Sequence, residues 1–121
     1  MKVWIDYERN PKDYLSEKDA ESVIWIKEIR EALNLFLKKS EEIEVLYLDY
    51  YMDSPVIFGS EFVFYAKRGG KKMFPNLKSI YLHSNDDDAI DELMELAPNL
   101  ENQGISLEVA PYRNKKGNFR G

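Results

Sequence analysis

Apolar residues along the chain gather in five short runs separated by polar stretches, which is the pattern of a domain built on a β-sheet. In the third run, the residues from Val45 to Leu48 are all apolar or aromatic, without alternation. Such a run is typical of a strand covered on both faces, as in the middle of a parallel sheet. The predicted strands are residues 2–6, 22–27, 44–52, 77–83 and 104–110.

The segment 22–27 allows two interpretations. It can continue a long helix toward Lys39, because Ser16 and Asp19 have the spacing of a helix-start capping box. It can instead form a strand, because its four adjacent apolar residues put bulk on every face. We favour the strand, and we interpret residues 11–20 as a polar surface connection.

Helical patterns lie between the later strands. Residues 28–39 place Ile29, Ala32, Leu33 and Phe36 on one face, with acids early and lysines late, as the helix dipole prefers. Further helices are predicted at residues 61–68, ended by Gly69 and Gly70, and at residues 86–96, before Pro98.

Strands that alternate with helices predict an α/β domain with a mostly parallel five-stranded sheet and right-handed crossovers. The length of 121 residues and the hydrophobic content of 44% suit one domain with a single core. We assign this domain to residues 1–113 and expect residues 114–121 to form a flexible C-terminal tail.

Composition excludes several classes of function. The net charge of -5 is spread along the chain, so no extended DNA-binding surface is expected. The chain has no cysteine and a single histidine, His83, which excludes thiolate zinc sites and multi-histidine metal sites. No signal segment and no run of membrane-spanning length is present, so we expect a cytoplasmic protein without a membrane partner.

Polar side chains follow the apolar runs at the points where the strands end. In a parallel sheet all the carboxyl ends share one edge, which is where open α/β sheets bind ligands. The residues expected to converge at this edge are Asp6, Asp49, His83 with Ser84, and Arg113.

These strand ends resemble those of the receiver-like family predicted to process cyclic phosphates, a degenerate form of the response-regulator receiver. The resemblance rests on Ile5-Asp6-Tyr7-Glu8-Arg9, the tryptophan-bearing second strand, Tyr47-Leu48-Asp49, Gly59 and His83-Ser84-Asn85, and it covers most of residues 2–110. It implies a single three-layer, flavodoxin-like domain that acts on a small phosphate-containing ligand or an RNA end.

The chain also departs from that family. Tyr7 stands in place of a second acid, and Tyr50 and Tyr51 replace a histidine and an acid. Receivers hold Mg²⁺ with such acids, so the resemblance implies a weak Mg²⁺ site on Asp6 and Asp49, completed by waters or by Glu8 or Asp53 in place of the missing acids.

The resemblance assigns roles if the edge is catalytic. His83 would be the acid or base, helped by Asp49 and Asp6, because cleaving a cyclic phosphate needs both proton transfers. Arg9 would clamp the phosphate in a bidentate manner. The other residues expected to bind substrate are Ser84, Asn85, Tyr50, which would stack on a base, and Arg113.

Each role has a structural alternative. His83 can be an ordinary hydrogen-bonded residue, Asp49 can cap the next segment, and Arg9 can be a surface residue paired with Glu8 or Asp13. Ser84 and Asn85 are also favoured residue types at a helix N-cap.

Two functions from different classes therefore follow. The first is a phosphodiesterase-like hydrolase that processes the cyclic phosphate of a nucleotide or an RNA end. The alternative is a catalytically degenerate receiver-like module that binds a nucleotide or a protein partner.

Overall fold

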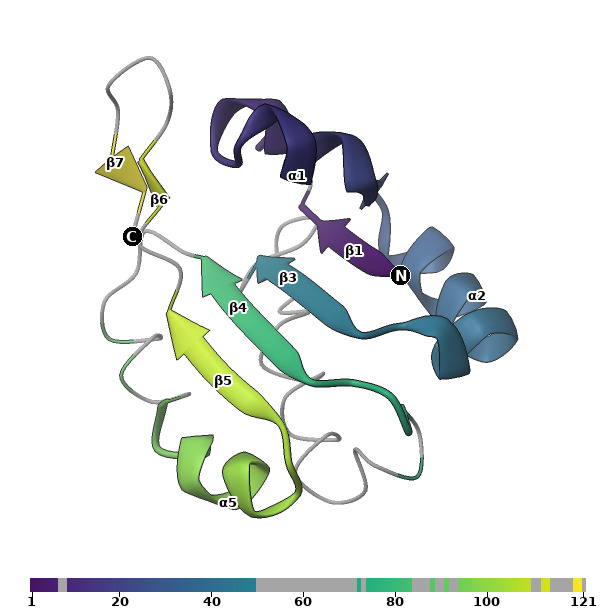
Figure 1. Cartoon of the computed structure of the whole chain (residues 1–121), viewed down its shortest axis with the longest axis vertical. Coiled ribbons are helices and arrows are strands. Elements are labelled where there is room, and N and C mark those ends of the chain that lie inside the picture. The colour runs from purple at the N-terminus through teal and green to yellow at the C-terminus, as the bar shows by residue number, and fades with distance from the viewer. Residues whose placement is uncertain are drawn as a thin grey trace.

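Five parallel strands form the central sheet of the computed structural model, in the order β2-β1-β3-β4-β5 (Figure 1). The structure describes residues 1–6, 9–49, 72, 74–83, 88, 91, 94–109, 112–113 and 119–120. This topology confirms the predicted α/β class with a receiver-like parallel sheet. The strands are β1 (Lys2–Ile5), β2 (Val23–Ile26), β3 (Val45–Asp49), β4 (Ser79–His83) and β5 (Ser106–Val109).

Helices and short turns connect these strands. The described helices are α1 (Glu17–Ser22), α2 (Ile29–Lys39) and α5 (Ala97–Asn102), with 3-10 turns at Pro11–Asp13 and Ser40–Glu42. None of the helices in the described part of the chain is both long and apolar enough to cross a bilayer.

Two helices predicted in later segments lie wholly or partly outside the described residues. The predicted helix at 61–68 lies outside the described residues, and of the predicted helix at 86–96 only Asp88, Asp91 and Met94 are described as helical. Within the predicted tail of residues 114–121, β7 (Phe119–Arg120) pairs antiparallel with β6 (Tyr112–Arg113), which lies at the end of the predicted domain.

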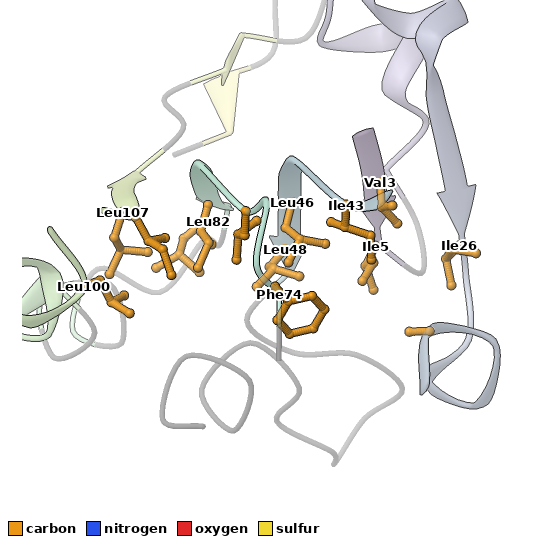
Figure 2. Close-up of a cluster of buried hydrophobic side chains, with 14 residues drawn as sticks. Val3, Ile5, Ile26, Ile43, Leu46, Leu48, Phe74, Leu82, Leu100 and Leu107 are labelled. Atoms are coloured by element: carbon orange, nitrogen blue, oxygen red, sulfur yellow. The ribbon is translucent and has the colours of Figure 1, made fainter. Parts of the chain in front are cut away.

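One face of the sheet carries the main hydrophobic core (Figure 2). Alternate strand residues point to this face, and in β1, β3 and β4 these residues are apolar and fully buried. Phe74 and Leu100 add to the core from outside the sheet. The strand residues concerned are Val3, Ile5, Leu46, Leu48, Ile80 and Leu82.

The opposite face carries a smaller, aromatic cluster. Trp4 and Tyr47 come from the sheet, while Leu15 and Ala20 come from the connection that precedes β2. All four side chains are buried. This cluster fastens the segment between β1 and β2 over the sheet.

The connection that contains residues 11–20 is more ordered than the sequence predicted. Ser16 accepts a hydrogen bond from the backbone N–H of Asp19, and this cap begins α1. The helix ends at Ser22, and β2 begins at the next residue. The predicted strand is therefore confirmed, but the prediction of a plain surface connection was wrong, because the capping pattern starts a six-residue helix there.

Helix α2 is confirmed, but its predicted buried face is partly wrong. Leu33 is 51% exposed, whereas Leu35 and Phe36 pack against the main core beside the buried Ala32. The Phe36 ring meets the Phe74 ring edge-on at a centroid distance of 5.2 Å. The helix therefore contacts the sheet at the i, i+3 and i+4 positions counted from residue 32.

The sequence analysis ended the helix of residues 86–96 before Pro98, whereas the structure has a further helix there. Helix α5 begins at Ala97 with Pro98 in its first turn. Proline is tolerated there because the first N–H groups of a helix have no partner within the helix. Leu100 then reaches the core, and Gly104, at a φ of 81°, turns the chain into β5.

Candidate functional site at the carboxyl edge of the sheet

The predicted site positions on three neighbouring strands lie beside one another. Asp49 and His83 are register partners at the ends of β3 and β4. Ile5 of β1 pairs with Leu48, so Asp6, which follows β1, comes next to position 49. The arrowheads of these strands meet at one edge of the sheet in Figure 1. The chain fold therefore brings positions 6, 49 and 83 together.

Asp6 and Arg9 form a largely buried ion pair at this edge. The Asp6 carboxylate is completely buried, and only 12% of the Arg9 side chain is exposed. One carboxylate oxygen, Oδ1, accepts the backbone N–H of Arg9 at 2.9 Å, and Oδ2 accepts from Arg9 Nη1 at 3.1 Å. Arg9 is thus neither a surface residue nor the partner of Asp13, because Asp6 holds its backbone and its guanidinium together.

Two tryptophans anchor this pair through their indole N–H groups. Trp4 Nε1 donates to the carbonyl oxygen of Arg9 at 2.8 Å, and Trp25 Nε1 donates to the carbonyl oxygen of Asp6 at 3.0 Å. The backbone N–H of Asp6 also donates to the carbonyl of Ile26 at 3.0 Å. Both residues of the ion pair are therefore tied to the sheet through their backbones.

The sequence interpretation missed these anchors. Its only cue was the pair of tryptophans in adjacent predicted strands. A buried indole N–H usually finds a hydrogen-bond acceptor, so each tryptophan implied a nearby carbonyl. Sequence alone did not indicate which carbonyl, because the segment after β1 has no regular pattern.

An aromatic row lies across the sheet directly behind the edge. Trp25, Trp4, Tyr47 and Tyr81 are successive register partners on four neighbouring strands. Trp4 and Tyr47 lie 5.2 Å apart between ring centroids, and Tyr47 stacks on Tyr81 at 5.2 Å with 20° between the ring planes. Each ring precedes a residue of the edge by two positions, so the row forms a rigid support for positions 6, 49 and 83.

Lys27 adds a positive charge at the outer end of this row. Its ammonium nitrogen lies 4.1 Å from the centroid of the Trp25 ring, within the range of a cation–π contact. Lys27 follows Ile26, the register partner of Ile5, and so comes next to Asp6 along the edge. The edge thus carries two cationic residues near Asp6: Arg9, three residues later in the chain, and Lys27, beside Asp6 on the neighbouring strand.

Burial raises the pKa of the Tyr47 hydroxyl, and the nearby Tyr81 and Asp19 raise it further. The folded state therefore holds this proton more tightly than the unfolded chain, in which tyrosine has a pKa of about 10. The stabilisation is complete below that pH and is lost as the pH rises above it. We expect the free energy of unfolding to fall more steeply above about pH 10 in the wild type than in Tyr47→Phe.

Urea unfolding over an alkaline pH series measures this difference. Tyr14→Phe is the control for losing a hydroxyl from the same aromatic cluster, because the Tyr14 ring lies 6.1 Å from that of Trp4. Parallel pH profiles for the wild type and Tyr47→Phe would contradict the prediction.

For the remaining predicted site residues the structure describes the backbone only, or nothing. The structure describes only the backbone at Asp49 and His83. Arg113 lies in β6, opposite Phe119 of β7, and Figure 1 draws this pair of strands beyond the carboxyl ends of β4 and β5. Tyr50, Ser84 and Asn85, predicted to bind substrate, lie outside the described residues.

A parallel sheet in this order, with an acid at the end of β1 and another at the end of β3, defines a receiver-like domain. The family model of the cyclic-phosphate processing receiver domain matches residues 1–99. The chain belongs to this family, whose description connects it with cyclic-phosphate processing. No curated protein and no solved structure matches the chain significantly.

Proposed function

We propose that this protein is a phosphodiesterase-like hydrolase that opens the cyclic phosphate of a nucleotide or an RNA end at the carboxyl edge of the sheet. One observation carries the proposal: Asp49 and His83 are register partners beside the buried Asp6–Arg9 ion pair. The edge thus combines an acid, a histidine and a fixed cation, which are the groups that phosphate-ester hydrolysis uses.

The proposed reaction needs two proton transfers. A base removes a proton from water as the water oxygen bonds to phosphorus, and an acid protonates the ribose oxygen as its bond to phosphorus breaks. The product is a phosphomonoester with one free hydroxyl. His83 suits these transfers because the pKa of histidine is ordinarily near neutral. In the proposal, Asp49 orients the imidazole.

Arg9 would stabilise the charge that develops on the phosphoryl oxygens. Its guanidinium is held by Asp6 and its backbone by Trp4, so it needs little rearrangement when substrate binds. Preorganised charge of this kind is usually a large part of catalysis. Asp6 would then act through Arg9, as a positioning residue.

The same ion pair also gives weight to a second function. Both carboxylate oxygens of Asp6 accept hydrogen bonds from Arg9, as expected of a residue with a structural role. With tyrosines at positions 7, 50 and 51 in place of polar family residues, the edge would then be a module that binds a nucleotide or a protein partner without turnover.

Replacing His83 with alanine distinguishes the two functions. We expect turnover to fall by about 10²–10⁴-fold, the usual contribution of a general acid or base. Phosphorus-31 NMR follows new phosphomonoester signals from 2′,3′-cyclic nucleotides, 3′,5′-cyclic nucleotides, cyclic dinucleotides and an RNA that ends in a cyclic phosphate.

Ser79→Ala is the matched control, because Ser79 lies at the opposite end of the same strand. It should keep its turnover. Binding-induced shifts without new signals in the wild type would favour the binding module. Turnover that survives in His83→Ala would show that another group performs the proton transfer.

A further inference from the structure

The Asp6–Arg9 ion pair raises the question of which cation neutralises the Asp6 carboxylate in the working site. We propose that the guanidinium of Arg9 is the resident cation of this edge: it fills the place at Asp6 where a receiver-like site would hold a divalent metal. The site then takes its phosphate ligand without a metal ion. Only the statement about the phosphate ligand rests on the proposed function, because occupancy of Asp6 by Arg9 can be tested without any substrate.

The geometry around Asp6 does not suit a magnesium ion. Mg²⁺ requires near-octahedral oxygen ligands at about 2.0–2.1 Å and usually keeps several of its waters. The Asp6 carboxylate has no exposed surface, and its two oxygens accept from the Arg9 backbone N–H and from Arg9 Nη1. A hydrated ion reaches this carboxylate only if the guanidinium leaves.

The charge of the ion pair itself leads to the same conclusion. The carboxylate of Asp6 and the guanidinium of Arg9 neutralise each other, and position 7 is a tyrosine, so the other acids of this part of the chain and of the edge are Glu8 and Asp49. A divalent cation beside Asp6 would have to approach a guanidinium that remains charged at any physiological pH. Lys27, one register position along, adds further positive charge.

The anchors fix the backbones from which both side chains of the pair project. Trp4 Nε1 donates to the Arg9 carbonyl at 2.8 Å, which keeps the Arg9 backbone close to Asp6. Trp25 holds the Asp6 carbonyl in the same way at 3.0 Å. The Arg9 side chain keeps 12% of its surface exposed, and we propose that a phosphate oxygen approaches it from that side. Guanidinium groups bind phosphate well because of their planar array of donors.

Manganese binding tests the proposal directly. Mn²⁺ serves as the probe, and water-proton relaxation reports its affinity for the wild type, Asp6→Asn, Arg9→Gln and the double variant with both changes. Asp6→Asn keeps an acceptor for Arg9 but removes the charge that a metal ligand needs. We expect the wild type and Asp6→Asn to bind Mn²⁺ equally weakly.

Arg9→Gln is expected to gain Mn²⁺ affinity by at least about tenfold, because a metal can then neutralise Asp6. The double variant is expected to lose this gain. Wild-type binding about tenfold tighter than that of Asp6→Asn would make Asp6 a metal ligand and overturn the proposal. A folded Arg9→Gln variant without any gain would also overturn it. If Arg9→Gln fails to fold, the comparison of the wild type with Asp6→Asn decides.

A second arm separates this inference from the proposed function. Turnover of the best cyclic phosphate is compared in buffer with EDTA and in buffer with Mg²⁺, and equal rates are expected. Turnover that disappears in EDTA and returns with Mg²⁺ would overturn the metal-free site while upholding the hydrolase. Absence of turnover in every condition would reject the hydrolase, and the manganese comparison would still decide the role of Arg9.

Discussion

Asp6→Ala is expected to lower the free energy of unfolding by about 3–5 kcal/mol, because it leaves a largely buried guanidinium without its counter-charge. Only 12% of the Arg9 side chain is exposed, so water compensates little for the lost carboxylate. The variant also removes the acceptor of the Arg9 backbone N–H. Urea unfolding monitored by circular dichroism gives the difference.

Asp88→Ala provides the control, because Asp88 is an exposed acid in a helical position, where substitutions usually change stability by less than about 0.5 kcal/mol. The double variant Asp6→Ala/Arg9→Ala should lose less stability than the sum of the two single variants, since the two residues share one interaction. Additive losses would mean that the ion pair contributes nothing specific.

Trp4→Ala is the second large effect, with an expected loss of about 3–5 kcal/mol for a fully buried aromatic side chain. The ring supports Tyr47 and Tyr14, and its N–H holds the Arg9 carbonyl. Trp4→Phe narrows these contributions, because it keeps an aromatic ring but deletes the indole N–H together with part of the ring volume. The unsatisfied carbonyl alone is expected to cost about 1–3 kcal/mol, and Trp25→Phe removes the same ring volume.

Trp25→Phe is the matched comparison, since it deletes the same kind of donor from a half-buried ring. We expect a smaller loss there, because water can replace part of the bond. Urea unfolding of the three variants measures both differences. A Trp4→Phe variant as stable as the wild type would show that the indole bond does not hold the segment after β1.

The strands were predictable because each carries a run of adjacent apolar residues. A surface helix would bury only one side of such a run, whereas a strand inside a sheet buries both faces. Val45 to Leu48 illustrates this, and β3 occupies the centre of the sheet as expected. The segment 22–27 was ambiguous because two signals overlap there: the cap at Ser16 starts a real helix, and the strand begins directly after it at Val23. The sequence contains both the helix cap and the strand pattern. It does not show where the helix ends and the strand begins, because tertiary contacts determine that boundary.

Helix faces were harder to predict. Leu33 and Leu35 are equally apolar, and only the docking angle of α2 on the sheet determines that Leu35 packs against the core while Leu33 faces solvent. Pro98 was misleading for a related reason, because proline ends one helix and is equally suited to the first turn of the next.

The candidate site was predictable as a set of positions, because parallel strands bring their carboxyl ends together whatever their separation in sequence. The pairing within it was less accessible. Arg9 was assigned to a phosphate or to Glu8 or Asp13, whereas in the structure it pairs with Asp6, three residues earlier. That choice depends on Trp4 and Trp25, which fold the segment after β1 back onto its own acid.

The position of these two indoles has an optical consequence. Trp4 and Trp25 are the only tryptophans in the chain, and each donates its N–H to a backbone carbonyl of the ion pair. Light at the long-wavelength edge of protein absorption, where indole absorbs and the other side chains hardly do, therefore excites only groups bonded to this edge. The protein carries its own emission probe, so a ligand that shifts Asp6 or Arg9 can be titrated by intrinsic fluorescence without a label.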